Sequence, residues 1–486
     1  MSALLVALDR HDDAVLAISD REGDHPWGAI RSKAAAMARR LASDPTLGPD
    51  DGVGARIGVL VSPGHRWLAT LIGIWRAGMV AVPLSPRYPD RELTDLLDDA
   101  GAAMVVHDAR NHRAELGIRL VAVEDLLTGA ATAPTRATDP LAMLLYTSGT
   151  TGRPKGVRLG HRQLAHQANL LVRAWGLADR TALLHVLPLH HMHGIAIALL
   201  PSLVAGMTVR MLPKFDAETV WDALGDVDTF MGVPTMVHRL LEAHDAAPEP
   251  QQTRWRESAT KLSLCTSGSA ALPVTLAERW RAVTGRIPLE RYGMTEIGVG
   301  CTNPLDPTKR RRGWVGRPLP TLQTRIVDED TGETGDGPGM LEVRGPSVFD
   351  GYWRRPEATA EAFHDGWFIT GDVAERASDG SIKLHGRRSV DILKSGGYKL
   401  SALEIEEQLR DHEAVAEVAV VGVPDEVWGQ VVAAVIVPRP GTQIDEEAMR
   451  AWLAERLADY KIPRLWAVRE ALPKNALGKV LKRSLW

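Results

Sequence analysis

The chain has few cysteines. Its 486 residues include only Cys265 and Cys301, and neither stands in a CxxC or histidine-rich pattern. Such spacing excludes a disulfide framework and indicates no zinc site. The sequence therefore predicts a protein of a reducing compartment such as the cytosol.

Long apolar runs are also lacking. No stretch of about 18 or more apolar residues occurs, and in MSALLVALDRHDD no basic residue precedes the apolar run. A membrane span would need such an apolar stretch, and an export signal would need a basic residue ahead of its apolar run. We expect neither, and we expect a cytoplasmic location.

An excess of one charge is absent as well. The formal net charge is -4, with both signs mixed along the chain, whereas nucleic-acid binding needs a broad basic surface. The run KRRRGWVGR (309–317) is the local exception, and a run of this length is typical of a solvated loop. Nucleic acid is therefore not expected as a partner, and no obligate protein partner is evident.

The composition is that of an ordinary globular protein, 45% hydrophobic and 24% charged. The chain is long enough for two or three folding units. Short apolar runs alternate with segments of helical character, such as 66–77, which predicts parallel sheets covered by helices. The glycine-rich stretch 331–339 between QTRIV and MLEV predicts a hairpin in a separate, more antiparallel region. The expected strands are 56–61, 79–84, 103–108 and 141–147.

The sequence pattern changes near residue 386, and the remaining residues, about 100, are typical in number of a compact domain. We therefore predict an α/β fold with a large N-terminal domain (1–386) of layered sheets plus a smaller β region, and a small α+β C-terminal domain (387–486). In the smaller domain we expect helices at 401–409 and 445–459 and strands at 415–421 and 431–437.

The stretch LLYTSGTTGRPKGV (144–157) follows a predicted strand with three glycines, four hydroxyl residues and a lysine. Such loops direct backbone N–H groups and hydroxyls at phosphate oxygens, because glycine permits the tight turns. It is not a Walker loop, since only two residues separate Gly149 from Gly152 and Pro154 precedes Lys155. The stretch predicts a phosphate-binding loop of another kind.

TSGTTGRPKG resembles the phosphate loop of the adenylate-forming enzymes, the superfamily of acyl-CoA synthetases, adenylation domains and firefly-type luciferases. The resemblance spans essentially the whole chain, because further motifs follow in the same order. They are PLHHMHG (188–194), SGSAAL (267–272), YGMTE (292–296), FITGDV (368–373), GRR (386–388), GGYKLSALEIE (396–406) and PKNALGK (473–479).

The resemblance implies an acyl-CoA synthetase that uses ATP, CoA and Mg²⁺ and forms an acyl-adenylate before the thioester. It makes Glu296 the Mg²⁺ ligand and places Thr295 at the α-phosphate, His191 among the catalytic residues, and Arg387 beside the ribose ligand Asp372. The remaining nucleotide-binding residues that it implies are Thr147, Ser148, Gly149, Thr150, Thr151, Lys155, Gly268, Ser269, Ala270 and Tyr292.

The resemblance also makes Lys479 the lysine that reaches the carboxylate and the α-phosphate during adenylation. The C-terminal domain would then rotate between the two half-reactions, and Gly396, Gly397 and Tyr398 would border the CoA tunnel. The segment 387–396 departs from the family pattern by about one extra residue. The hinge is therefore left open between Ser389 and Asp391.

The acyl end of the site would be built near PLHHMHG, MGVPTM (231–236) and the residue before YGMTE. This chain places His193, Arg239 and Arg291 there, and a buried guanidinium requires an anionic partner. Together with ERYGMTE (290–296), these side chains give the acyl end a resemblance to that of the malonyl-CoA synthetases. The resemblance predicts malonate, and also methylmalonate, as substrates. Arg239 could equally lie on an exposed helix face.

Three alternatives keep some of these features. A short-chain monocarboxylate or aryl acyl-CoA synthetase would use the arginines as structural ion pairs. A free-standing adenylation enzyme would load a carrier-protein thiol instead of CoA. A binding protein of the same fold would not need Lys155, Glu296, Asp372 and Lys479, which are all present.

Overall fold

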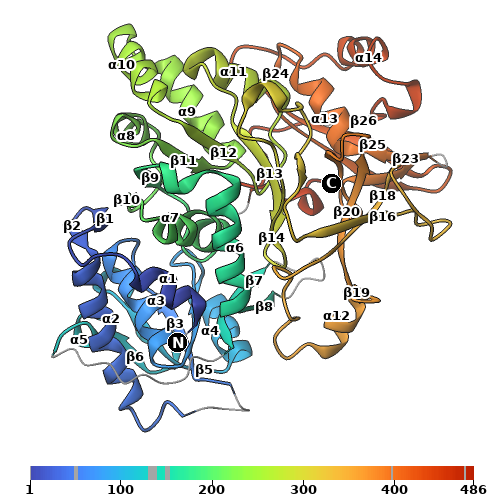
Figure 1. The fold of residues 1–486 in the computed structure, drawn as a ribbon. Coiled ribbons are helices and arrows are strands. Elements are labelled where there is room, and N and C mark those ends of the chain that lie inside the picture. The colour runs from blue at the N-terminus through green and yellow to red at the C-terminus, as the bar shows by residue number, and fades with distance from the viewer. Residues whose placement is uncertain (1, 49–52, 130–139, 148–153, 396–397, 475–477) are drawn as a thin grey trace.

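The computed structural model describes residues 2–48, 53–129, 140–147, 154–395, 398–474 and 478–486. In Figure 1 the chain passes from a helix-covered N-terminal layer through a central sheet to a C-terminal unit that lies beside α11 and β13. This is the predicted α/β class, with large layered sheets, a smaller antiparallel region and a small C-terminal unit. The fold class is confirmed.

The first sheet has the order β6-β5-β3-β4-β7-β8. Its strand pairs are parallel except β7 with β8, which form the hairpin that flanks the phosphate-loop motif. The strands expected at 56–61, 79–84, 103–108 and 141–147 all lie here, and so does the helix expected at 66–77. The elements are α2 (Trp27–Ala42), β3 (Arg56–Leu60), α3 (His65–Arg76), β4 (Val80–Pro83), α4 (Asp90–Ala100), β5 (Ala102–His107), β6 (Leu120–Ala122), α5 (Val123–Leu126), β7 (Leu141–Thr147) and β8 (Lys155–Gly160).

The second sheet has the order β15-β14-β13-β12-β11-β9-β10-β1-β2. Its centre is parallel, so the carboxyl ends of β11, β12 and β13 meet at one edge. The elements are α1 (Ala3–Asp9), β1 (Leu16–Asp20), β2 (Gly23–Pro26), α6 (His161–Ala174), β9 (Ala182–His185), the π-helical η4 (His193–Leu199), α7 (Leu200–Ala205), β10 (Thr208–Met211), α8 (Ala217–Ala223), β11 (Thr229–Gly232), α9 (Pro234–Ala246), α10 (Glu249–Thr260), β12 (Leu264–Ser267), α11 (Val274–Thr284), β13 (Leu289–Met294), β14 (Gly298–Thr302) and β15 (Arg317–Pro318).

The third sheet is antiparallel, with the order β17-β16-β18-β20-β19 and β21 paired to β20. The hairpin predicted around 331–339 is confirmed, because β16 and β18 pair across that stretch. The basic run 309–317 is mostly exposed, with the Arg311 guanidinium 3.5 Å from the ring centre of Trp314. The elements are β16 (Gln323–Val327), β17 (Thr334–Gly335), β18 (Gly339–Arg344), α12 (Pro356–Glu361), β19 (Phe363–His364), β20 (Trp367–Arg376) and β21 (Ile382–Arg387).

The C-terminal unit packs α13 and α14 on a sheet of order β23-β22-β25-β24, with β26 beside β25. The helix expected at 445–459 is shorter than predicted, because it ends at Ala454 and the chain turns so that Leu457 packs against the core of this unit. The other three predicted elements are present. The bounds are β22 (Ile392–Ser395), β23 (Tyr398–Ser401), α13 (Ala402–Arg410), β24 (Val415–Asp425), β25 (Gly429–Pro438), α14 (Glu446–Ala454) and β26 (Leu465–Val468).

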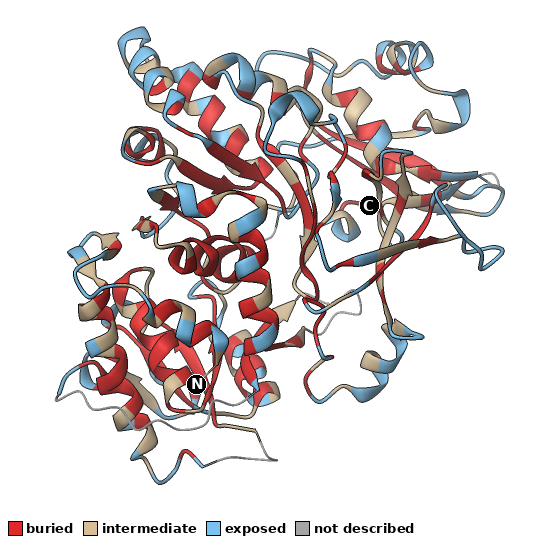
Figure 2. Ribbon diagram, in the orientation of Figure 1, coloured by how far each residue is buried: buried red, intermediate tan, exposed pale blue. Residues whose placement is uncertain are grey.

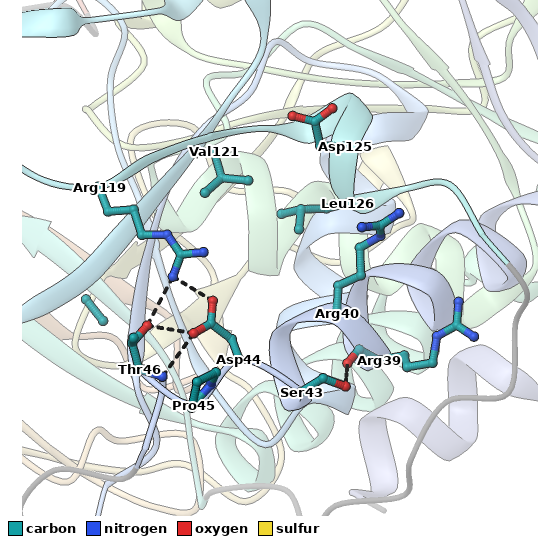
Figure 3. A pocket seen from close by; sticks show the side chains of 11 residues that line it. Arg39, Arg40, Ser43, Asp44, Pro45, Thr46, Arg119, Val121, Asp125 and Leu126 are labelled. Carbon is teal, nitrogen blue, oxygen red and sulfur yellow. Dashed lines mark hydrogen bonds and ion pairs between the residues drawn. The ribbon is translucent and has the colours of Figure 1, made fainter.

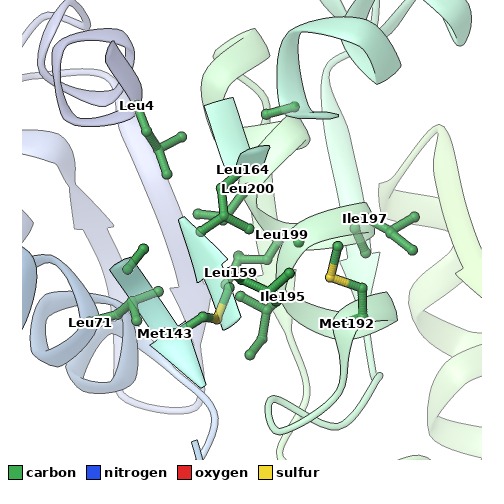
Figure 4. Packing of buried hydrophobic residues seen from close by; sticks show 14 of the residues in the cluster. Leu4, Leu71, Met143, Leu159, Leu164, Met192, Ile195, Ile197, Leu199 and Leu200 are labelled. Atoms are coloured by element: carbon green, nitrogen blue, oxygen red, sulfur yellow. The ribbon is translucent and has the colours of Figure 1, made fainter. Parts of the chain in front are cut away.

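Separate apolar cores support these units. The first two sheets share a core in which Met143 and Leu159 face Ile195 and Leu199 of η4 (Figure 4). Figure 2 shows the buried residues concentrated in the sheets and the inner helices of the N-terminal layers. The C-terminal unit has its own cluster around Ile405. The domain boundary at 386/387 remains a prediction, and it falls at the end of β21, before its last residue.

No helix within the described residues combines the length and the apolar character needed to cross a membrane.

Candidate active site

The hairpin of β13 and β14 carries the Thr-Glu pair of the YGMTE motif. Thr295 and Glu296 occupy the turn, and Ile297 N–H donates to the Met294 carbonyl at 3.2 Å. Gly298 adopts φ 70°, and a β-carbon at Gly293 would lie 2.0 Å from the Gly298 carbonyl oxygen. Because a side chain would collide there, the two glycines are what allow the hairpin to close at its tip.

Glu296 is buried and contacts Tyr352, which lies beside Lys155 of the phosphate-loop motif. The Tyr352 hydroxyl donates to Glu296 Oε1 at 3.0 Å, and Lys155 Nζ lies 5.1 Å from the centre of the Tyr352 ring. Thr147, the last residue of β7, is paired with Lys155 across the β7–β8 hairpin. Burial raises the pKa of the Glu296 carboxyl, which the Tyr352 hydrogen bond and Arg387 oppose. The site thus holds a carboxylate that a nearby cation would stabilise.

Asp372 links the second and third sheets. The Tyr292 hydroxyl donates to Asp372 Oδ2 at 2.6 Å, and Arg387 Nη1 lies 3.4 Å from Asp372 Oδ1. The register of β20 with β21 brings these two side chains together, because Asp372 and Arg387 are directly paired across the two strands. Burial raises the pKa of Asp372, while Arg387, Tyr292 and Lys479 act in the opposite direction.

Lys479, from the far end of the sequence, lies near enough to Asp372 for its charge to act against the rise in the pKa of that carboxyl. The neighbouring Gly478 adopts φ 78°, and a β-carbon there would lie 2.7 Å from Oγ1 of Thr235 on α9. The segment that carries Lys479 therefore packs against the N-terminal unit. Glu407 of α13 reinforces the contact by accepting from the Val274 N–H at 2.8 Å.

Arg291 is buried, with 4% of its surface exposed. Its Nε and Nη2 atoms have no hydrogen-bond partner among the described residues, and burial lowers its pKa from 12.5 to about 9. A β-carbon at position 268 would lie 2.4 Å from Arg291 Cζ. Gly268, just beyond β12, is therefore what lets the guanidinium lie against the backbone.

Two histidines of the PLHHMHG motif lie at the same end. His193 is buried, and its Nδ1 lies 3.3 Å from Ser269 Oγ. Burial and the neighbouring Arg291 charge hold the pKa of His193 well below its usual value. Burial also lowers the pKa of His191 to about 4. Both imidazoles are therefore neutral near pH 7.

Ser269 itself adopts φ 69° and is exposed together with Ala270. A left-handed serine is uncommon and marks a locally constrained backbone. The two residues form the outer rim of the segment that begins at the buried Gly268.

Some predicted site residues stand apart. Arg239 is exposed on α9, with its guanidinium 5.1 Å from the Phe215 ring centre, which favours the alternative of a helix face. Tyr398 is exposed and stacks on Tyr460 at 4.3 Å. Ser148, Gly149, Thr150, Thr151, Gly396 and Gly397 lie outside the described residues. All of these roles remain predictions.

Tyr352 is a site residue that the motif analysis missed. It contacts both Glu296 and Lys155, yet it lies more than 50 residues from either in sequence. The available signal was FDGYW (349–353), an aromatic cluster around a glycine in a chain with few aromatics. Gly351 adopts φ 129° there.

The surface hollow of Figure 3 is not this site. It is formed on α2, α5 and the neighbouring strands, and Arg119 crosses it to Asp44 at 2.6 Å and to Thr46 at 3.0 Å. None of the predicted catalytic or binding residues that the structure describes lines it. Its basic side chains include Arg39 and Arg40.

Comparison with protein families decides the assignment. Residues 6–353 match the AMP-binding enzyme family, and residues 404–479 match the AMP-binding enzyme C-terminal domain. The chain belongs to the AMP-binding enzyme family. The predicted membership of the adenylate-forming superfamily is thereby confirmed.

Individual relatives of this AMP-binding enzyme can be named. The mitochondrial malonate–CoA ligase ACSF3 of Mus musculus is 37% identical, covering 97% of this chain and 88% of its own length. ATP-bound MatB from Rhodopseudomonas palustris matches with a TM-score of 0.91 at 34% identity, over 100% of this chain and 98% of that one. A malonyl-CoA ligase product complex with methylmalonyl-CoA and AMP matches with a TM-score of 0.71 at 34% identity, over 98% of this chain and 100% of that one. The described arrangement is thus more similar to the ATP-bound structure.

Proposed function

We propose that the protein is a malonate–CoA ligase that also accepts methylmalonate. The reaction joins the acid to CoA with conversion of ATP to AMP and diphosphate, through an acyl-adenylate. The observation that carries the choice of acid is the buried Arg291, whose Nε and Nη2 have no partner among the described residues. Relatives named malonate–CoA ligases support the same choice.

The physical argument for a dicarboxylate is one of charge. A guanidinium in a water-poor site is costly unless an anion faces it, and its planar fork suits a carboxylate bound through two parallel hydrogen bonds. The distal carboxylate of malonate supplies that anion, while neutral His193 adds a donor from whichever ring nitrogen carries the proton. The methyl group of methylmalonate adds little volume, and a pocket discriminates such a group by about 1–3 kcal/mol.

In the first half-reaction, a carboxylate oxygen of the acid attacks the α-phosphorus of ATP, and diphosphate leaves. Both reactants are anions, so the protein contributes positive charge and positioning. We assign Lys155 to the β- and γ-phosphates, Thr295 to the α-phosphate, and Lys479 to the carboxylate of the acid and the α-phosphate oxygens. Asp372, with Tyr292 and Arg387 beside it, would hold the ribose hydroxyls.

The residues around Glu296 fit a Mg²⁺ ion. Burial raises the pKa of this carboxyl, so a cation would stabilise its charged form, and Mg²⁺ binds one or two carboxylates together with phosphate oxygens. We propose that Glu296 holds the ion against the ATP phosphates. When bound, it would neutralise the charge that develops on the departing diphosphate.

In the second half-reaction, the CoA sulfur attacks the acyl carbon, and AMP leaves with its phosphate oxygen. We propose that the C-terminal domain withdraws Lys479 for this step, and that Gly396, Gly397 and Tyr398 then border the path of the thiol. The free, buried cysteines Cys265 and Cys301 suit a reducing compartment, and we place the reaction in the cytoplasm.

Pyrophosphate release with ATP, Mg²⁺ and CoA across malonate, methylmalonate, succinate, propionate and benzoate tests the proposal. We expect malonate and methylmalonate to give the highest kcat/KM. A preference for propionate or benzoate would instead indicate a monocarboxylate or aryl synthetase. Transfer to a carrier-protein thiol but not to CoA would indicate an adenylation enzyme, and no release with any acid would indicate a binding protein.

A further inference from the structure

Lys482, three residues beyond Lys479, has a largely buried side chain. Only 9% of its side chain is exposed, and its Nζ lies 2.7 Å from Asp391 Oδ1 and 2.6 Å from Glu406 Oε1. Burial opposes its charge, but the two carboxylates outweigh that effect and raise its pKa. Lys482 is therefore a fixed cation inside the C-terminal unit.

Both carboxylates are themselves held in place. Glu406 of α13 accepts from the Val420 N–H at 2.8 Å and from Arg410 at 2.9 Å. The Asp391 carboxylate accepts from the Arg387 N–H at 3.0 Å, and the Asp391 carbonyl accepts from the Ala402 N–H at 2.8 Å, where α13 begins. Lys482 thus joins two points fixed by α13, and charge-assisted hydrogen bonds of this kind set a direction as well as a distance.

The base of the segment that carries Lys479 is held by several contacts. Lys474 forms an antiparallel bridge with Val480, and the Leu481 N–H donates to the Pro473 carbonyl at 2.8 Å. Leu472 and Val480 add apolar packing, which is not directional. The Lys482 ion pairs come immediately after this base, where they fix the direction in which the segment leaves the domain.

We propose that Lys482 is a positioning residue that aims Lys479 at the reacting groups by tying the base of its segment to Asp391 and Glu406. The inference rests on the proposed adenylation role of Lys479 and is independent of which acid is used. Among the described residues, Lys482 pairs with Asp391 and Glu406 and with none of the predicted substrate-binding residues, so we assign its effect to Lys479. It is needed in the half-reaction that uses Lys479 and is dispensable in the other.

The test compares the two half-reactions in the purified full-length chain carrying Lys482→Met, which keeps much of the length but removes the charge. We expect acid-dependent ATP–pyrophosphate exchange to lose about a hundredfold in kcat, the effect of misplacing a catalytic group by about 1 Å. The KM values for ATP and acid should stay nearly unchanged. The rate of thioester formation from supplied acyl-AMP and CoA should also be retained.

Lys461→Met is the matched control. Lys461 is another lysine of the C-terminal unit that pairs with a carboxylate of α13, since its Nζ lies 2.7 Å from Glu404 Oε1, but it does not adjoin the Lys479 segment. It should leave both half-reactions intact. An equal loss in the control, or an equal loss of both half-reactions in Lys482→Met, would overturn the proposal.

A second variant separates positioning from folding, because Lys482→Met leaves the buried Glu406 and the half-buried Asp391 without this cation. In Lys482→Met/Asp391→Asn one of these charges is also removed, and Glu406 keeps Arg410. We expect thermal stability closer to that of the wild type while exchange stays slow. Recovery of exchange along with stability would contradict a positioning role.

Failure of the proposed substrate is distinguishable from failure of this inference. If the wild type shows no exchange with malonate, the acid panel supplies another substrate, and the comparison of Lys482→Met with Lys461→Met is made with that acid.

Discussion

Replacing Arg291 by alanine removes the one buried guanidinium that the proposal places against the substrate. Burial lowers its pKa from 12.5 to about 9, a drop that corresponds to about 5 kcal/mol of lost solvation of the cation. A distal carboxylate would recover much of that energy, and breaking a buried ion pair costs about 3–5 kcal/mol. We therefore expect kcat/KM for malonate to fall between about a hundredfold and a few thousandfold.

The assay is acid-dependent pyrophosphate release, measured with malonate and with propionate in the same preparation. Propionate has no distal charge, so Arg291→Ala should leave its kcat/KM unchanged or increase it. Arg239→Ala is the comparison variant, and its exposed position predicts a change of less than about threefold. Full malonate activity in Arg291→Ala, or equal losses with both acids, would refute the reasoning.

Three further predictions concern the moving parts of the site. Lys479→Ala should abolish acid-dependent ATP–pyrophosphate exchange but spare thioester formation from supplied acyl-AMP; loss of both would argue against its assigned role. Arg388 is held to the N-terminal unit through the Gly371 carbonyl at 3.0 Å and Glu329 at 2.8 Å, whereas the side chain of Asp391 is held by Lys482 and the Arg387 N–H; of the two hinge candidates, we propose Ser389 as the pivot. Ser389→Pro should therefore slow thioester formation while exchange persists, and unchanged thioester kinetics would place the hinge elsewhere. Burial and the like charge of Glu407 raise the pKa of Glu290 from 4.5 to about 8. The folded protein therefore binds the proton of the Glu290 carboxyl more tightly than the unfolded chain does, and this proton binding contributes to stability. That contribution is fully present below pH 4.5 and is lost as the pH rises through about 8. Thermal unfolding of Glu290→Gln should accordingly show a flatter loss of stability across this window than the wild type, and parallel curves would contradict the shift.

Sequence patterns predicted the regular elements well where a single physical cause determines them. The apolar run of β7 and the amphipathic pattern of α13 each specify one element, because burial of apolar surface favours only one conformation. The end of α14 was less well predicted. The periodic pattern continues to Leu457, yet the helix ends at Ala454 because Leu457 reaches the same core after a turn.

The motifs predicted which residue types belong to the site, but not the contacts that these residues make. Arg291 could be named from ERYGMTE, but its burial depends on Gly268, just beyond the neighbouring strand β12. Tyr352 and Lys482 were not singled out, because their roles arise from contacts across distant segments. Long-range packing of this kind leaves no periodic signal in a single sequence.

The central claim is tested most directly by following the adenylate itself. The protein is incubated with ATP, Mg²⁺ and either malonate or propionate without CoA, the bound adenylate is quantified by mass spectrometry, and CoA is then added. The account predicts malonyl-AMP in amounts comparable to the enzyme, its conversion to malonyl-CoA with one AMP released per thioester, and little propionyl-AMP. Propionyl-AMP in equal or greater amounts, or malonyl-CoA formed without a preceding adenylate, would contradict it.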